Sequence, residues 1–187
     1  AYGAAGIIFI EEKKLTWSVS GRQYPFPVVH ILKEAFKLPV RYIKFNMESV
    51  LEPRHQTQNV IGYIKGTQKP DSFLVFSAHY DHLGRMGHAT YFPGANDNAS
   101  GIAMMLNLIK HYSTTNPKPA YSMVCIGFAG EEAGLKGSEF YTKNPLFSLL
   151  KIKFLINMDL LGTGDDGMMV VNGDVFKPEF ELLTQLN

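Results

Sequence analysis

The sequence predicts an α/β fold in which a mainly parallel sheet carries helices on both faces. Three apolar runs of strand length, residues 71–78, 121–128 and 153–157, alternate with two segments of helical spacing, residues 97–112 and 132–141. An alternation of strand, helix and strand favours parallel pairing, because each helix returns the chain to the edge where the previous strand began. The first two strand runs are almost continuously apolar, as expected of strands that are covered on both faces.

Composition and charge indicate one ordinary globular domain. The 187 residues are 45% hydrophobic and 19% charged, which is enough for one core but not for two full domains. The formal net charge of +1 creates no strong field toward nucleic acid or an acidic membrane, so we expect neither as a partner. We also expect no membrane-spanning helix, which needs roughly 18 apolar residues, and no signal peptide in this chain.

Residues 1–39 carry no catalytic constellation and differ in pattern from residues 40–187. Residues 4–10 predict a turn that leads into a short strand. Residues 25–29 are too rich in proline for a central strand, and residues 31–37 have helical spacing.

Period-two alternation of apolar and polar residues begins at residue 40. It predicts half-buried strands over residues 40–46 and 58–66. Near the end of the chain, residues 168–171 predict a further strand and residues 178–186 a helix. We find no internal repeat and no low-complexity segment.

Histidine and carboxylate side chains gather where the predicted strands end or the helices begin. Sites in open α/β sheets form outside the carboxyl ends of the strands, so we expect these segments to converge. Imidazole nitrogen and carboxylate oxygen are zinc ligands, whereas a thiolate cluster is excluded because Cys125 is the only cysteine. The four segments are Ser77-Ala-His-Tyr-Asp-His-Leu-Gly84, Gly94-Ala-Asn-Asp-Asn-Ala-Ser-Gly101, Ala129-Gly-Glu-Glu-Ala-Gly-Leu-Lys-Gly-Ser138 and Asn157-Met-Asp-Leu-Leu-Gly162.

Chemistry gives the side chains in these segments different roles. Carboxylates on the neighbouring residues Glu131 and Glu132 do not easily point at one ion, so one would bind metal and the other would be a general base. Asp81 is placed to hydrogen-bond the second ring nitrogen of His79. The candidate metal ligands are His79, Asp97, Glu132 and Asp159.

Each of these acids also has a plain structural explanation. Asp97 alone could cap a helix, Asp159 could start a turn, and two glutamates in a first helical turn favour the helix dipole. The appearance of all four segments in one chain, each at a strand end or a helix start, is the strong indication of a metal site. Asn98-Ala-Ser100 matches a glycosylation acceptor, but its place at a helix start beside the site leads us to expect no modification.

The motifs over residues 59–162 resemble the catalytic domain of zinc-dependent exopeptidases typified by bacterial secreted two-zinc aminopeptidases. Glutamate carboxypeptidases and glutaminyl cyclases are relatives of that family. The resemblance implies a three-layer α/β/α sandwich with a mixed, mainly parallel central sheet and two Zn²⁺ ions per complete site. It also implies a peptide or protein N-terminus as the substrate and an extracellular or periplasmic location.

The resemblance also implies a role for each site residue. His79 would bind one zinc, Asp97 would bridge both ions, and Glu132 and Asp159 would complete separate ions. Glu131 would be the general base that activates the water. Asp81 would be the partner that orients the imidazole.

The family pattern contains a further histidine well downstream of the position of Asp159, on the ion shared with Glu132. No histidine follows His111 in this sequence. We therefore expect a piece of a larger peptidase, a site with one firmly held ion, or a ligand supplied by another chain. His82 and His88 are expected to line the cleft rather than bind metal.

Residues 1–39 resemble the tail of a protease-associated domain or form an N-terminal extension, and residues 40–187 would be an incomplete catalytic domain. The function indicated is that of a metal-dependent aminopeptidase, although this chain alone could be inactive. One alternative is a carboxypeptidase or glutaminyl cyclase on the same fold, and Asp97 favours two ions over the single ion of a cyclase. The same residues are also compatible with an inactive peptidase-like binding module, or with a flavodoxin-like domain whose acids are incidental.

Overall fold

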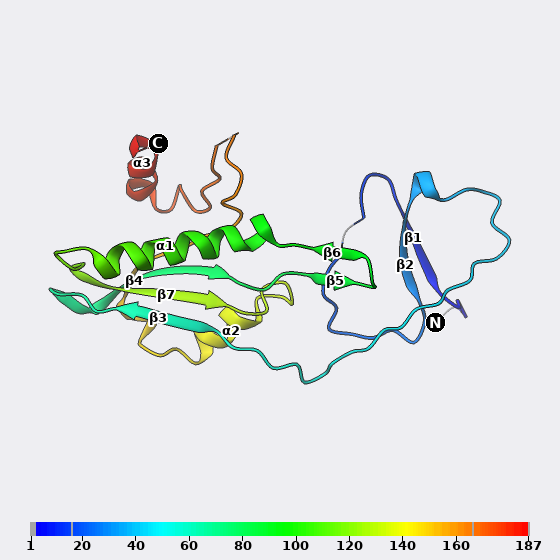
Figure 1. Cartoon of the computed structure of the whole chain (residues 1–187), viewed down its shortest axis with the longest axis horizontal. Helices are drawn as coiled ribbons and strands as arrows, with labels where there is room; N and C mark the ends of the chain where they lie inside the picture. The colour runs from blue at the N-terminus through cyan, green and yellow to red at the C-terminus, as the bar shows by residue number, and fades with distance from the viewer. Residues whose placement is uncertain (1–2, 16, 166, 187) are drawn as a thin grey trace.

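A four-stranded mixed sheet lies in the part of the molecule on the left of Figure 1. The computed structural model describes residues 3–15, 17–165 and 167–186. The strand order is β3, β7, β4, β8, in which β4 pairs in parallel with β7 and β8, and β3 pairs antiparallel with β7. The mixed, mainly parallel sheet is therefore confirmed. Its strands are β3 (Val60–Ile64), β4 (Lys69–His79), β7 (Tyr121–Phe128) and β8 (Ile152–Asn157).

Helices α1 (Gly101–Thr114) and α2 (Lys136–Lys143) cover opposite faces of this sheet (Figure 1). Successive side chains of a strand point to opposite faces, and β7 shows the result. Val124 packs in a cluster with Tyr141 of α2, whereas Cys125 packs with Met105 of α1 and with Met158. The three-layer α/β/α arrangement is confirmed.

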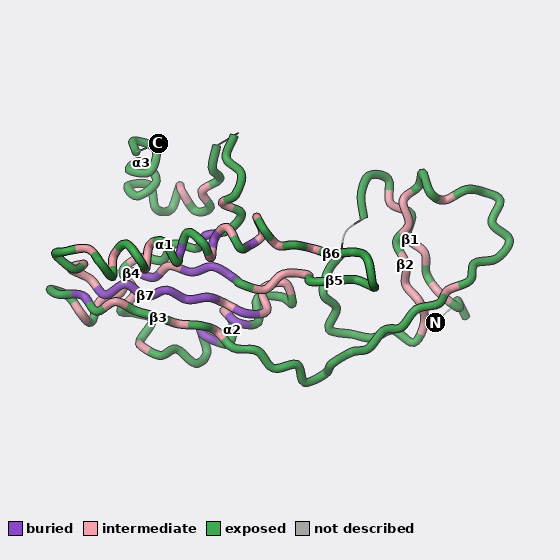
Figure 2. Tube along the Cα trace, viewed as in Figure 1, coloured by how far each residue is buried: buried purple, intermediate pink, exposed green. Residues whose placement is uncertain are grey.

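The core lies in the two inner strands, β7 and β4. The buried residues concentrate along them, while the N-terminal segment and α3 (Lys177–Leu186) are mainly exposed (Figure 2). Six consecutive residues of β7 are buried, but the edge strand β8 is mostly exposed. The inner strands therefore provide a rigid base for the residues that follow their carboxyl ends.

A separate two-stranded parallel sheet lies near the N-terminus. It consists of β1 (Ile7–Glu11) and β2 (Val28–Leu32), and a long irregular segment links it to β3 (Figure 1). The strand predicted within residues 4–10 is present as β1. The helical spacing of residues 31–37 gives only a 3₁₀ turn, Lys33–Ala35, because β2 continues to Leu32. The predicted boundary between the N-terminal segment, residues 1–39, and the catalytic domain, residues 40–187, stays a prediction.

Two predicted strands are wrong. Residues 40–46 and 168–171 have no regular secondary structure, and Tyr42 and Met169 in them are 87% and 90% exposed. Alternating polarity favours an extended conformation, but a strand also needs a partner for its backbone hydrogen bonds, and neither segment pairs with a strand in the described part of the chain. A short antiparallel hairpin that was not predicted consists of β5 (Gly84–Met86) and β6 (Thr90–Phe92).

Helix α1 begins at Gly101, four residues later than predicted. Ala95–Ser100 forms a distorted turn in which Asp97 and Asn98 have non-helical backbone angles. The Asn98 side chain accepts a hydrogen bond from the Gly101 N–H at 3.0 Å and donates one to the Met158 carbonyl at 3.0 Å. Asn98 is 2% exposed, so its amide is engaged in both bonds, and the absence of glycosylation stays a prediction.

Helix α2 also begins later than predicted, at Lys136. The preceding turn contains Gly134 at φ 91° and Leu135 at φ 58°, and these left-handed conformations interrupt a helix. Among the helices in the described part of the chain, none combines the length and apolar character needed to cross a membrane.

Replacement of Gly101 by alanine is expected to destabilise the protein by about 1–3 kcal/mol. A Cβ at this position would lie 2.4 Å from the Met158 carbonyl oxygen, so the start of α1 would have to move away from the segment that follows β8. Gly62→Ala is the control, because no described residue lies within 4 Å of its added Cβ. Urea unfolding monitored by circular dichroism measures both variants, and equal losses of stability would contradict the prediction.

Candidate metal centre

Three parallel strands deliver the site residues to one edge of the sheet. β4 ends at His79, β7 is followed by Glu131 and Glu132, and β8 is followed by Asp159. Asp97 approaches from the distorted turn before α1. The structure therefore brings together residues from four separate segments, as the sequence predicted.

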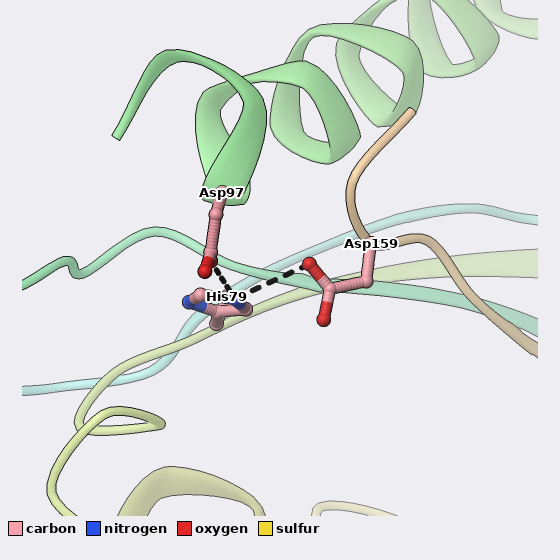
Figure 3. Close-up of side chains that lie close together, drawn as sticks. All are labelled: His79, Asp97 and Asp159. Atoms are coloured by element: carbon pink, nitrogen blue, oxygen red, sulfur yellow. Dashed lines mark ion pairs between the residues drawn. The ribbon is translucent and has the colours of Figure 1, made fainter. Parts of the chain in front are cut away.

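The first cluster contains His79, Asp97 and Asp159, whose side chains point toward one another (Figure 3). His79 Nε2 lies 3.1 Å from Asp97 Oδ1 and 3.5 Å from Asp159 Oδ1. Ligands at 2.0–2.1 Å from a tetrahedral zinc ion are about 3.3 Å apart, so both separations fit a shared ion. His79 is buried, whereas both carboxylates are partly open to solvent, which leaves one side of the cluster accessible.

The second cluster contains His82, Asp97 and Glu132. His82 Nδ1 lies 2.6 Å from Glu132 Oε1 and 3.9 Å from the same Asp97 oxygen that faces His79. Both His82 Nδ1 and Glu132 Oε1 are buried without a hydrogen-bond partner among the described residues. One imidazole nitrogen and two carboxylates are also ligand types that zinc accepts.

His82 lies close to the predicted ligands Asp97 and Glu132. It was expected to line the cleft, but its ring nitrogen lies within the second cluster. The sequence feature that could have indicated this position is that His82 follows His79 by three residues, just beyond the end of β4. His88, by contrast, is exposed and lies outside both clusters of described residues.

Asp81 makes contacts that differ from the predicted ones. The Asp81 backbone carbonyl, not the carboxylate, lies within hydrogen-bond distance of His79 Nδ1, at 3.1 Å, and the carboxylate is 3.8 Å from that nitrogen. The two carboxylate oxygens instead accept the backbone N–H groups of Glu131 and Glu132, each at 3.1 Å. Asp81 therefore ties the end of β4 to the turn that carries both glutamates.

Glu131 lies beside the first cluster, in a cavity of about 430 Å³ that His79 and Asp159 also line. Most of the remaining lining is apolar, including Phe128 and Leu135. Burial is the main reason why the pKa of Glu131 lies above its ordinary value; the His79 imidazole opposes the rise and the neighbouring carboxylates increase it. A carboxylate whose pKa is raised toward neutrality suits proton transfer.

Polar side chains hold the Asp97 turn against the loop that carries Asp159. Asn96 Oδ1 accepts the Gly162 N–H at 2.6 Å, and Ser100 Oγ accepts the Leu161 N–H at 2.8 Å. Together with the bond from Asn98 to Met158, these contacts fix the two segments on both sides of Asp159. The separation between the Asp97 and Asp159 carboxylates therefore depends on a hydrogen-bonded framework.

Cys125 takes no part in this centre. It is buried between β7 and α1, and burial raises the pKa of its thiol to about 11. The thiol therefore stays protonated at neutral pH and offers no thiolate to a metal.

The profile of peptidase family M28 matches residues 59–185. The chain belongs to this family. The family resemblance predicted from the motifs is therefore confirmed.

Aminopeptidase YwaD of Bacillus subtilis is 30% identical over 170 residues, which cover 87% of this chain and 35% of that protein. A probable zinc metalloprotease of Pyricularia oryzae is 36% identical over 113 residues, or 58% of this chain and 22% of that protein. Among solved structures, a zinc aminopeptidase from Bacillus subtilis has 29% identity and a TM-score of 0.47 over 58% of this chain and 25% of its own. The chain thus spans about a third or less of these relatives.

Asp81→Ala is expected to weaken zinc binding about 10–100-fold, as is usual for residues that position metal ligands. The change removes both acceptors that hold the backbone of Glu131 and Glu132. Competition with a chromophoric zinc chelator measures the affinity. Asp71→Ala is the control, because Asp71 is 88% exposed in β4 and far along the strand from the centre. An unchanged zinc affinity in Asp81→Ala would show that the carboxylate does not position the site.

Proposed function

We propose that this chain forms the metal-binding part of a zinc-dependent aminopeptidase, an exopeptidase that removes the N-terminal residue of a peptide or protein. The observation that carries the proposal is the convergence of His79, Asp97 and Asp159 at the ends of parallel strands, beside Glu131. Membership of peptidase family M28 supports hydrolysis of a peptide bond. The similarity to a protein named aminopeptidase, over 87% of this chain, supports action at the N-terminus.

In this proposal His79, Asp97 and Asp159 would hold one zinc ion, and Glu132 would join Asp97 at a second. Zinc, when bound, polarises a carbonyl group and lowers the pKa of water. Two clusters that share Asp97 favour two ions over one, which supports a peptidase over a single-ion cyclase.

Glu131 would move the proton. Its carboxylate would accept a proton from the water whose oxygen attacks the scissile carbonyl carbon. As the C–N bond breaks, Glu131 would donate that proton to the leaving amine, so the carboxylate is restored after each turnover. The raised pKa of Glu131 supports both steps, and the presence of this residue argues against an inactive binding module.

An extracellular or periplasmic location stays a prediction that depends on the family resemblance alone.

Carboxypeptidase activity is the main enzymatic alternative. It would require a free C-terminus in the substrate, whereas an aminopeptidase requires a free N-terminus. Paired substrates blocked at one end or the other separate these possibilities.

Glu131→Gln is expected to lower kcat by roughly 10²–10⁴-fold in the intact protein, because an amide cannot accept the proton. Zinc content should remain unchanged, since Glu131 is not assigned as a ligand. Hydrolysis of aminoacyl p-nitroanilides measures activity, and elemental analysis measures zinc.

Glu139→Gln is the matched control, because it makes the same change outside the centre. Glu139 lies in α2, is half exposed and pairs with Lys143. Near-normal turnover in Glu131→Gln would refute the assignment of the base. Cleavage of N-acetylated peptides with a free C-terminus would instead favour a carboxypeptidase.

A further inference from the structure

We propose that Asn59 is a positioning residue for Glu131, because its side-chain amide bonds to both ends of the turn that carries this glutamate. The inference rests on the proposed function, in which Glu131 is the general base. Asn59 directly precedes β3, and β7 separates β3 from β4, the strand that ends at His79. The residue therefore acts on the site from outside the metal ligands.

The turn between β7 and α2 closes on itself. The Ala129 carbonyl accepts the Gly137 N–H at 2.8 Å, and the Gly130 carbonyl accepts the Lys136 N–H at 2.9 Å. These two bonds join the two ends of the turn, and both glutamates of the site lie between them. The placement of the Glu131 carboxylate therefore depends on how the two ends are attached to the sheet.

The amide of Asn59 provides this attachment. Its Oδ1 accepts the Ala129 N–H at 3.1 Å, and its Nδ2 donates to the Gly137 carbonyl at 2.8 Å. β3 runs antiparallel to β7 with Val60 opposite Gly127, so the side chain bonds to the backbone just past the last paired residues. An amide offers both an acceptor and a donor, and here it uses one for each end of the turn.

Close packing leaves this contact little freedom. A Cβ on Gly137 would lie 2.4 Å from Asn59 Oδ1 and 2.3 Å from the Ala129 carbonyl oxygen, so only glycine allows the three segments to approach so closely. Gly137 is buried and Ala129 is 2% exposed, so solvent has little access to either backbone group. Loss of the amide would leave both groups without this partner unless the turn moved.

Two side chains thus hold the turn at two different places. The Asp81 carboxylate accepts the N–H groups of Glu131 and Glu132, whereas Asn59 bonds where the turn leaves β7 and enters α2. One attachment alone would let the turn rotate about it, and two attachments fix its orientation. A general base must lie within hydrogen-bond reach of the proton that it accepts, and a displacement of about 1 Å can lower a rate about 100-fold.

The test is a double-variant cycle on the hydrolysis of aminoacyl p-nitroanilides by the intact protein, with zinc in excess. Asn59→Leu keeps the branched shape of the side chain and removes both bonds, so it is expected to lower kcat roughly 10–100-fold with KM unchanged. In the Glu131→Gln background the same change should leave the residual kcat unaltered, because no base remains to be misplaced. Asn107→Leu is the matched control, since this exposed amide on α1 bonds to the Ala103 carbonyl of its own helix, and its kcat should equal that of the wild type.

The outcomes of the cycle separate this inference from the proposed function. An unchanged kcat in Asn59→Leu would overturn the inference and leave the aminopeptidase proposal standing. Equal losses of kcat with and without the Glu131 carboxylate would also overturn it, because Asn59 would then support the site as a whole. Near-normal turnover in Glu131→Gln would overturn both.

Amide hydrogen exchange tests the attachment of the turn without reference to activity. Asn59→Leu is expected to speed the exchange of N–H groups in residues 129–137 roughly 10–100-fold, as for the loss of two hydrogen bonds, while α1 keeps its wild-type protection. Asn59→Ala, which adds no apolar atoms, should show the same local pattern. Unchanged exchange in the turn, or faster exchange spread evenly over the chain in both variants, would contradict the inference.

Discussion

The carboxylate of Asp97 is the group on which the site depends. One of its oxygens lies 3.1 Å from the ring of His79 and 3.9 Å from that of His82, so it belongs to both clusters. Its backbone has non-helical angles and precedes the first turn of α1. A regular helix through this position would carry the side chain elsewhere, so the distortion of the turn and the chemistry of the site belong together.

Hydrogen bonds from the neighbours of Asp97 maintain this placement. The two asparagines that flank it bond to the backbone on both sides of Asp159. The carboxylate of Asp81 holds the turn of Glu131 and Glu132 in the same manner. A hydrogen bond to a charged group such as the Asp81 carboxylate contributes about 1.5–3 kcal/mol, and a neutral one such as those of the asparagines about 0.5–1.5 kcal/mol. Here these bonds fix the relative positions of segments far apart in the sequence.

The sequence was sufficient to predict the inner part of the fold and the residues of the first cluster. The strands that became β4, β7 and β8 are nearly continuous apolar runs, because inner strands are covered on both faces. Since parallel strands end at a common edge, the residues after them could be expected to meet. The predicted strands over 40–46 and 168–171 failed because alternating polarity does not reveal whether a partner strand is present.

The contacts of His82 and Asp81 could not be predicted, because both depend on how the chain turns after β4. A residue's position in a loop relative to a strand end sets which region it can reach, but not the direction of its side chain. The Asp81 carboxylate finds two N–H groups only because the turn after β7 approaches it. The His82 ring reaches Glu132 only because Gly94 leaves room behind it.

Metal binding and folding are linked in a site built this way. The carboxylates come from four segments, and their mutual repulsion opposes the arrangement that the polar framework enforces. An ion that binds the folded arrangement and not the unfolded chain stabilises it by mass action. Ions held by His79, Asp97 and Asp159, and by Glu132, would therefore act as cross-links between the ends of the strands. The framework of asparagine and backbone hydrogen bonds would then set the spacing of the ligands, and the ions would offset the charge that this spacing creates.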